Sequence, residues 1–228
     1  MSESALLHFA QHRLQEAALL CMAVVYAFRI RWLLSFKDAR DKQAPTGRGV
    51  VDPESGKYYS LANIAMPWAM ESTRNSPFFY LQFAVFHLGV ACAITLSFII
   101  PYLPGLLELP PVVKAIQGFT AAAFVIGVGR MIRRIAVPVM RLISTPDDYF
   151  SLALLTVWFP FAFLAAPNDR GGGEGVLLTF FFLTAFFLVY VPFSKISHYL
   201  YYPFTRFWLG RTMGHRGVFP MRQPVHPR

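Results

Sequence analysis

Two histidines lie in the apolar part of this chain, where few other side chains can do chemistry. His87 stands in Phe86-His87-Leu88-Gly89, and His198 follows the stretch Val191–Ser197. A neutral imidazole offers one ring nitrogen to a metal, so imidazoles on two facing helices can supply both axial ligands of a low-spin haem. A histidine in such a helix also commonly makes only a hydrogen bond to a neighbouring helix. Spacing alone leaves both interpretations open, axial ligation and helix bridging.

The surrounding residues suit a flat apolar cofactor that carries carboxylates. Gly89 would let a helix backbone approach a macrocycle closely, and 23 Phe residues are available to pack around it. A guanidinium binds a carboxylate through two parallel hydrogen bonds, which suits haem propionates. The same cations also suit anionic lipid and the control of topology, and this alternative stays open. The four candidates are Arg130, Arg133, Arg134 and Arg141.

The other potential ligands are isolated or lie near the chain ends. His8 and His12 are one helical turn apart, and we interpret them as solvated interfacial residues. The alternative is that they join a second haem site completed by a partner. Cys21 and Cys92 lack CxxC spacing and are interpreted as small apolar residues. Any iron–sulfur chemistry must therefore lie in another chain.

Composition defines the elements that must position these residues. Of the 228 residues, 55% are hydrophobic and 14% charged, and the mean hydropathy is +0.44. A soluble domain is about 45–50% apolar and about 25% charged, so we predict an integral membrane protein. A spanning helix needs about 20 mostly apolar residues. Five stretches qualify and predict an all-α bundle in one domain: residues 17–36, 78–100, 111–131, 149–166 and 176–199.

Basic residues predict the topology of this bundle. Of the 21 Lys and Arg residues, 18 fall at the end of the first span, in the loops 37–77 and 130–148, or beyond residue 194. The positive-inside rule therefore places the N-terminus outside and the C-terminus in the cytoplasm. The net charge of +9 then indicates topology and not binding to nucleic acid. The loop 37–77, the loop 130–148 and the tail from Tyr199, of which 200–228 lies beyond the last span, are expected to dock a cytoplasmic partner.

Three segments resemble the gamma subunit of respiratory nitrate reductase, a five-span membrane cytochrome b. The ending Val189–His198 (VYVPFSKISH) is similar to that family's fifth helix. Arg141–Asp148 resembles its approach to the fourth helix, and Phe86-His87-x-Gly89 resembles its first ligand. The resemblance implies a prokaryotic inner-membrane protein with His87 and His198 as axial ligands. It also implies quinol oxidation, with electrons passed to a cytoplasmic iron–sulfur subunit.

The chain departs from the family at the second haem. The distal ligands would map to Ser97 and Phe180, and neither side chain can ligate iron. We therefore expect one haem b, with electrons exchanged with quinone or menaquinone, or with a periplasmic multihaem cytochrome c. The departure favours a divergent branch paired with a heterodisulfide-reductase-like iron–sulfur subunit. The chain would be an electron-transfer subunit that is not catalytic alone. The alternative function is a haem-free membrane anchor.

Overall fold

The computed structural model describes residues 4–37, 41–47, 50–66, 68 and 70–221, and every regular element in them is a helix. Five helical stretches are long and apolar enough to cross a membrane. This confirms the prediction of an all-α, multi-pass membrane protein, while the sides on which the termini lie stay a prediction. The five stretches are Ala5–Leu34, Pro77–Tyr102 (α5), Pro110–Ala136 (α6), Pro146–Ala165 (α8) and Gly175–Phe193.

The chain divides into two compact units. The first unit is Met1–Arg29 with Leu81–Ile196, and the second is Ile30–Tyr80 with Ser197–Arg228. His87 belongs to the first unit and His198 to the second. The remaining α-helices are α1 (Ala5–Phe9), α2 (Gln15–Leu34), α3 (Pro53–Ala62), α4 (Glu71–Asn75), α7 (Pro138–Leu142), α9 (Gly175–Tyr190) and α10 (His198–His215).

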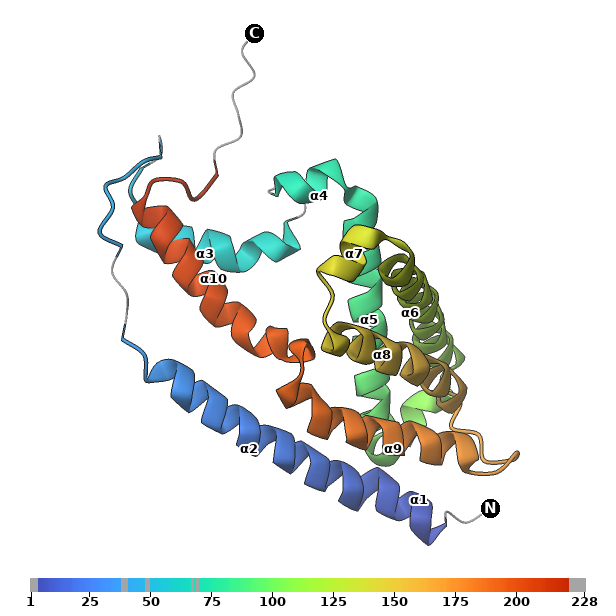
Figure 1. Cartoon of the computed structure of the whole chain (residues 1–228). Coiled ribbons are helices and arrows are strands. Elements are labelled where there is room, and N and C mark those ends of the chain that lie inside the picture. The colour runs from blue at the N-terminus through green and yellow to red at the C-terminus, as the bar shows by residue number, and fades with distance from the viewer. Residues whose placement is uncertain (1–3, 38–40, 48–49, 67, 69, 222–228) are drawn as a thin grey trace. The chain divides into compact units, whose positions relative to one another are not determined.

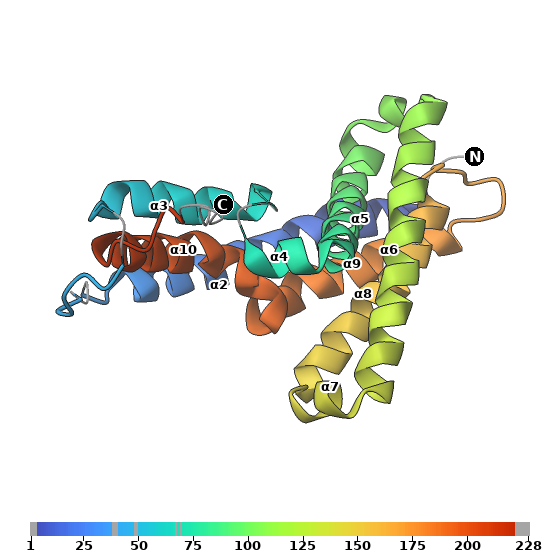
Figure 2. The same ribbon diagram turned by 90° about the horizontal axis from the view of Figure 1, so that it is seen from above.

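In the first unit, α5, α6 and α8 pack side by side (Figures 1 and 2). A Cβ added at Gly89 of α5 would lie 2.3 Å from the Ala123 Cβ of α6 and 2.9 Å from the Phe119 carbonyl oxygen. Gly127 of α6 meets Thr156 of α8 in the same way, at 2.6 Å from its Oγ1. The close approach expected at Gly89 is therefore made to a neighbouring helix and not to a cofactor.

The core of the first unit continues between α8 and α9. The Trp158 indole Nε1–H donates to Thr184 Oγ1 at 2.9 Å, and its ring lies parallel to that of Phe180 at a centroid distance of 6.1 Å. Both rings are almost fully buried. The N-terminal helix joins this core through Gln15, whose Nε2 donates to the Phe181 carbonyl oxygen at 2.7 Å. A polar bond thus anchors an otherwise apolar contact.

The helix that contains the first predicted span, 17–36, begins 12 residues before that range, at Ala5. Ser4 caps the helix, because its Oγ accepts the Leu7 backbone N–H at 3.1 Å. The helix then passes through a π-helical segment, Ala10–Leu14, into α2. The polar residues of this first part lower its hydropathy, so an apolar pattern does not predict that the helix starts at Ala5.

The fifth span differs from the prediction of one helix over 176–199. Regular α-helix ends at Tyr190, and a 3₁₀ turn covers Val191–Phe193. Pro192 has no N–H, and its ring would clash with a carbonyl one turn earlier. Ser194 is extended, with φ −108° and ψ 171°, and a second 3₁₀ turn leads to α10. His198 therefore opens a new helix instead of closing the fifth span.

The second unit is built from segments that the sequence suggested were a loop and a tail. In both views α3 runs alongside α10 (Figures 1 and 2). Glycines allow the contact: a Cβ at Gly56 would lie 2.4 Å from the Gly210 carbonyl oxygen, and one at Gly214 would lie 2.4 Å from that of Asp52. The pair is antiparallel, and the Arg206 Nε–H donates to the Ser60 carbonyl oxygen at 2.9 Å.

An ion pair closes the far end of this helix pair. The Arg216 Nε–H donates to Asp41 Oδ2 at 2.6 Å, and the Gly47 backbone N–H donates to the Arg216 carbonyl oxygen at 2.8 Å. The bond from Arg216, aided by the Gln43 backbone N–H, lowers the pKa of Asp41 below its ordinary value. Residues 41–47 are thereby tied to the end of α10.

Candidate haem-binding site

His87 lies on the exposed face of α5, one residue beyond the buried Phe86. Its Nδ1–H donates to the Phe83 carbonyl oxygen at 2.7 Å, because a carbonyl can only accept. The Phe83 ring lies 4.1 Å from the imidazole, centroid to centroid. The bond fixes the tautomer in which Nε2 carries the lone pair. It is made within the helix that carries His87, so it is not a bridge between helices.

Arg130 is the candidate arginine that lies over Phe86, the residue before this histidine. Its guanidinium carbon lies 5.0 Å from the centre of the Phe86 ring, and that ring lies 6.2 Å from the imidazole of His87. Gly127, one turn earlier on α6, lies beside the same ring, because a Cβ there would be in ordinary contact with the Phe86 Cε2 at 3.5 Å. The half-buried Arg130 and the exposed His87 thus flank one phenyl ring.

The other three candidate arginines are placed differently. Arg134 donates from its Nη1 to Ser144 Oγ at 2.5 Å and lies 3.8 Å from Asp148 Oδ2. Arg133, near the end of α6, and Arg141, on α7, are exposed. Arg134 is therefore engaged at the start of α8, and Arg130 is the member of the set that lies beside a candidate ligand.

His198 is the first residue of α10 and is exposed. The 3₁₀ turn Lys195–Ser197 precedes it directly. His87 and His198 belong to different units, so the surroundings of each histidine are described within its own unit only. Ligation of one iron by both stays a prediction.

A set of charged and hydroxyl groups fixes the chain just before His198. We call Asp147, Asp148, Tyr190 and Lys195 the aspartate clamp. Asp147 accepts the Tyr190 hydroxyl, and its Oδ2 accepts the Lys195 backbone N–H at 2.9 Å. Asp148 Oδ2 accepts the Lys195 ammonium at 2.7 Å. The clamp therefore joins the first turn of α8 to the residue three positions before His198.

The aspartate clamp links Arg141–Asp148 to Val189–His198, the two segments whose resemblance to the nitrate reductase gamma subunit was noted from the sequence. That resemblance gave the two carboxylates no role. A local signal for it exists in Thr145-Pro146-Asp147-Asp148, which matches a helix N-terminal capping pattern. Asp148 Oδ2 accepts the Thr145 backbone N–H and its hydroxyl, each at 2.8 Å. The contact with Lys195, 47 residues further along the chain, could not be predicted from that local pattern.

The positions that map to the family's distal haem ligands are occupied by packed side chains. The Ser97 hydroxyl donates to the Ile94 carbonyl oxygen of its own helix at 2.7 Å, and it is buried. Phe180 is fully buried against Trp158. The expectation of a single haem stays a prediction.

At the N-terminal end, His8 and His12 lie together, with ring centroids 4.7 Å apart. The His12 ring also meets the edge of Tyr102, whose hydroxyl donates to Glu16 Oε1 at 3.3 Å. Across the part of the chain that the structure describes, no three His, Cys, Asp or Glu side chains gather as a metal site. A second haem site completed by a partner at His8 and His12 stays a prediction.

Comparisons with known proteins found one similar protein and no matching family or solved structure. The chain is similar to a protein of Nitratidesulfovibrio vulgaris, with 28% identity over 184 residues that cover 75% of this chain and 77% of that protein. The name of that protein is simply "Protein" and states no activity. The similarity extends over about three quarters of both chains and is therefore not confined to a local motif.

Proposed function

We propose that this chain is a membrane electron-transfer subunit that carries one haem b, with His87 and His198 as the axial ligands. The observation that supports this most is the arrangement around His87. Its Nδ1–H is held by the Phe83 carbonyl oxygen, and Arg130 lies over the adjacent Phe86. An oriented imidazole, apolar rings and one cation are the groups that bind the iron, the macrocycle and a propionate of a b-type haem.

Individual residues of this chain would have separate roles in binding the haem. A bound haem supplies a one-electron iron couple whose potential follows its ligands and nearby charge. The Phe83 carbonyl oxygen orients the His87 ring and raises the basicity of its Nε2. The guanidinium of Arg130 would pair with a propionate in forked geometry.

The aspartate clamp supports the second ligand. Lys195 is held through its backbone N–H by Asp147 and through its ammonium by Asp148. Because His198 follows Lys195 by one 3₁₀ turn, the clamp would anchor the chain that leads to this ligand. We assign these residues a positioning role and not a catalytic one.

The partners follow from the same proposal. Electrons would pass between the quinone pool, with menaquinone as one substrate, or a periplasmic multihaem cytochrome c, and a cytoplasmic iron–sulfur subunit. The resemblance to the nitrate reductase gamma subunit and the concentration of basic residues support an inner-membrane protein with its N-terminus outside. The second unit, with α3 and α10, would be the docking face for the iron–sulfur subunit. The chain would not be catalytic alone.

Absorption spectroscopy on the purified full chain tests the proposal. We expect a reduced b-type α-band that disappears in His87→Ala and in His198→Ala. The matched control is His215→Ala, which removes another imidazole from α10 and should leave the band intact. A wild-type chain without haem, purified from cells that supply it, would contradict the proposal and favour the haem-free anchor.

A further inference from the structure

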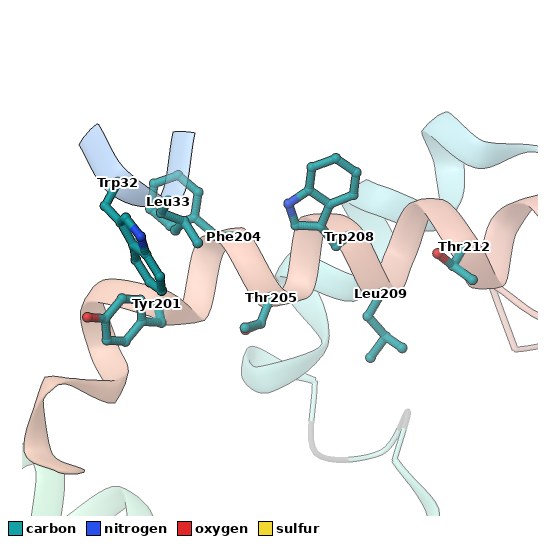
Figure 3. Close-up of a pocket in the computed structure, with 8 residues that line it drawn as sticks. All are labelled: Trp32, Leu33, Tyr201, Phe204, Thr205, Trp208, Leu209 and Thr212. Carbon is teal, nitrogen blue, oxygen red and sulfur yellow. The ribbon is translucent and has the colours of Figure 1, made fainter. Parts of the chain in front are cut away.

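An apolar groove of about 540 Å³ lies within the second unit, between the end of α2 and one side of α10. Figure 3 shows Trp32 and Leu33 of α2 close to Tyr201 and Phe204, with Trp208 on the following turn of α10. Thr205, Leu209 and Thr212 complete the lining. Trp32 is 61% exposed, so its indole forms one wall of an open groove and is not part of a buried core.

The groove lies at the end of a candidate membrane span. The span Ala5–Leu34 has Trp32 and Leu33 in its last turn. Trp and Tyr concentrate where a spanning helix leaves the hydrocarbon, because their rings are apolar and their N–H or O–H groups reach water. The groove therefore lies at the depth of lipid headgroups and the first carbons of acyl chains.

The two segments that line the groove carry only positive charges of their own. Neither segment that lines it, residues 28–37 and 198–221, contains an Asp or Glu, whereas both contain several Lys and Arg. The Arg211 guanidinium carbon lies 5.8 Å from the centre of the Trp208 ring, at the groove wall. Arg31 directly precedes Trp32. An apolar groove beside cations complements a molecule with hydrocarbon chains and an anionic head.

We propose that this groove binds an anionic phospholipid, with an acyl chain along the aromatic wall and the phosphate near Arg211. A neutral quinone head would gain nothing from the excess of positive charge, whereas a phosphate gains from each cation near the membrane surface. The bound lipid would fill the space between the end of α2, which belongs to the second unit, and α10. This proposal is independent of haem binding.

Fluorescence quenching by brominated lipid tests it on the full-length chain in phosphatidylcholine nanodiscs. Brominated phosphatidylglycerol, added as a minor component, should quench tryptophan more strongly than the same fraction of brominated phosphatidylcholine. The excess should be lost in the double variant Trp32→Phe/Trp208→Phe, because the groove indoles report it. Trp68 and Trp158 lie outside the groove lining and remain as internal references.

Charge variants separate a site from general attraction to an anionic membrane. Arg211→Gln should weaken the preference for phosphatidylglycerol about fivefold, the effect of about 1 kcal/mol for one cation near the surface. Lys42→Gln, an exposed lysine outside the groove lining, should leave the preference unchanged, and circular dichroism will confirm that both variants are folded. Equal quenching by the two lipids, or equal effects of the two substitutions, would overturn the proposal. Loss of the excess on adding menaquinone would also overturn it and assign the groove to quinone.

Discussion

Replacing Gly210 with alanine should loosen the second unit, because the glycine lies at the crossing of α3 and α10. An added Cβ would lie 2.5 Å from the Gly56 carbonyl oxygen, and 2.7 Å from both the Lys57 Cα and the Ser60 Cβ. Ordinary contacts need about 3.4–4 Å, and two of these atoms are backbone that cannot rotate away. The helices must therefore separate by about 1 Å and lose their close packing.

The magnitude follows from two opposing effects. Overpacking costs about 1–3 kcal/mol, and backbone neighbours favour the upper half of that range. Alanine recovers about 1 kcal/mol of helix propensity relative to glycine. The net loss in free energy of unfolding is therefore about 1–2 kcal/mol. For a unit of about 80 residues, this lowers the Tm by about 5–15 °C.

Thermal unfolding in detergent, followed by fluorescence, measures this effect because Trp208 lies on the same helix. Gly129→Ala on α6 is the matched control, since nothing lies within 4 Å of a Cβ added there. Its Tm should stay the same or rise. A Tm for Gly210→Ala at or above that of the wild type would refute the close crossing of α3 and α10.

Three further predictions concern charged groups. Arg130→Gln should lower the haem midpoint potential by several tens of millivolts in a redox titration, because one nearby cation is lost. The control Arg134→Gln should shift the potential less. Equal shifts in the two variants would contradict the assignment of Arg130. Lys195→Met should lower the free energy of unfolding by only about 0.5–1 kcal/mol in thermal unfolding, because the ammonium is half exposed and its ion pair is weakened by water. The same variant should reduce haem occupancy. Unchanged occupancy would argue against a positioning role for the aspartate clamp. Asp41→Asn should lower the Tm at pH 7. Because the folded-state pKa of Asp41 is lowered, its stabilisation is complete above its unfolded pKa of about 3.9 and is lost as the pH falls through the lowered value. Melting curves of wild type and variant should therefore converge in acid, and a constant difference would exclude the pair with Arg216.

Hydropathy was sufficient to predict the membrane helices, because each span is a local run of apolar residues. It misplaced two ends for physical reasons. The capped stretch from Ala5 is helical despite its polar residues, and Pro192 ends α9 before His198. Both signals, the Ser4 cap and the internal proline, are local and readable, but they act against the hydropathy average.

The second unit could not be derived from local patterns. Gly56 and Gly210 lie 154 positions apart, and nothing near either residue indicates that their backbones touch. The same holds for Asp148 and Lys195, whose contact depends on how α8 and α9 pack. For the candidate site, residue type alone suggested His87 and four arginines. Only the packing of α5 on α6 distinguishes Arg130, because it puts that cation over the ring of Phe86, the residue before the histidine.

Electron paramagnetic resonance of the oxidised full-length chain, combined with a haem-to-protein ratio, tests the central claim most directly. The account predicts one low-spin haem per chain with a bis-imidazole signal. His87→Ala and His198→Ala should each convert that signal to a high-spin form or abolish it, while His215→Ala preserves it. A ratio near two, a high-spin wild-type signal, or a low-spin signal that survives loss of either histidine would contradict the account.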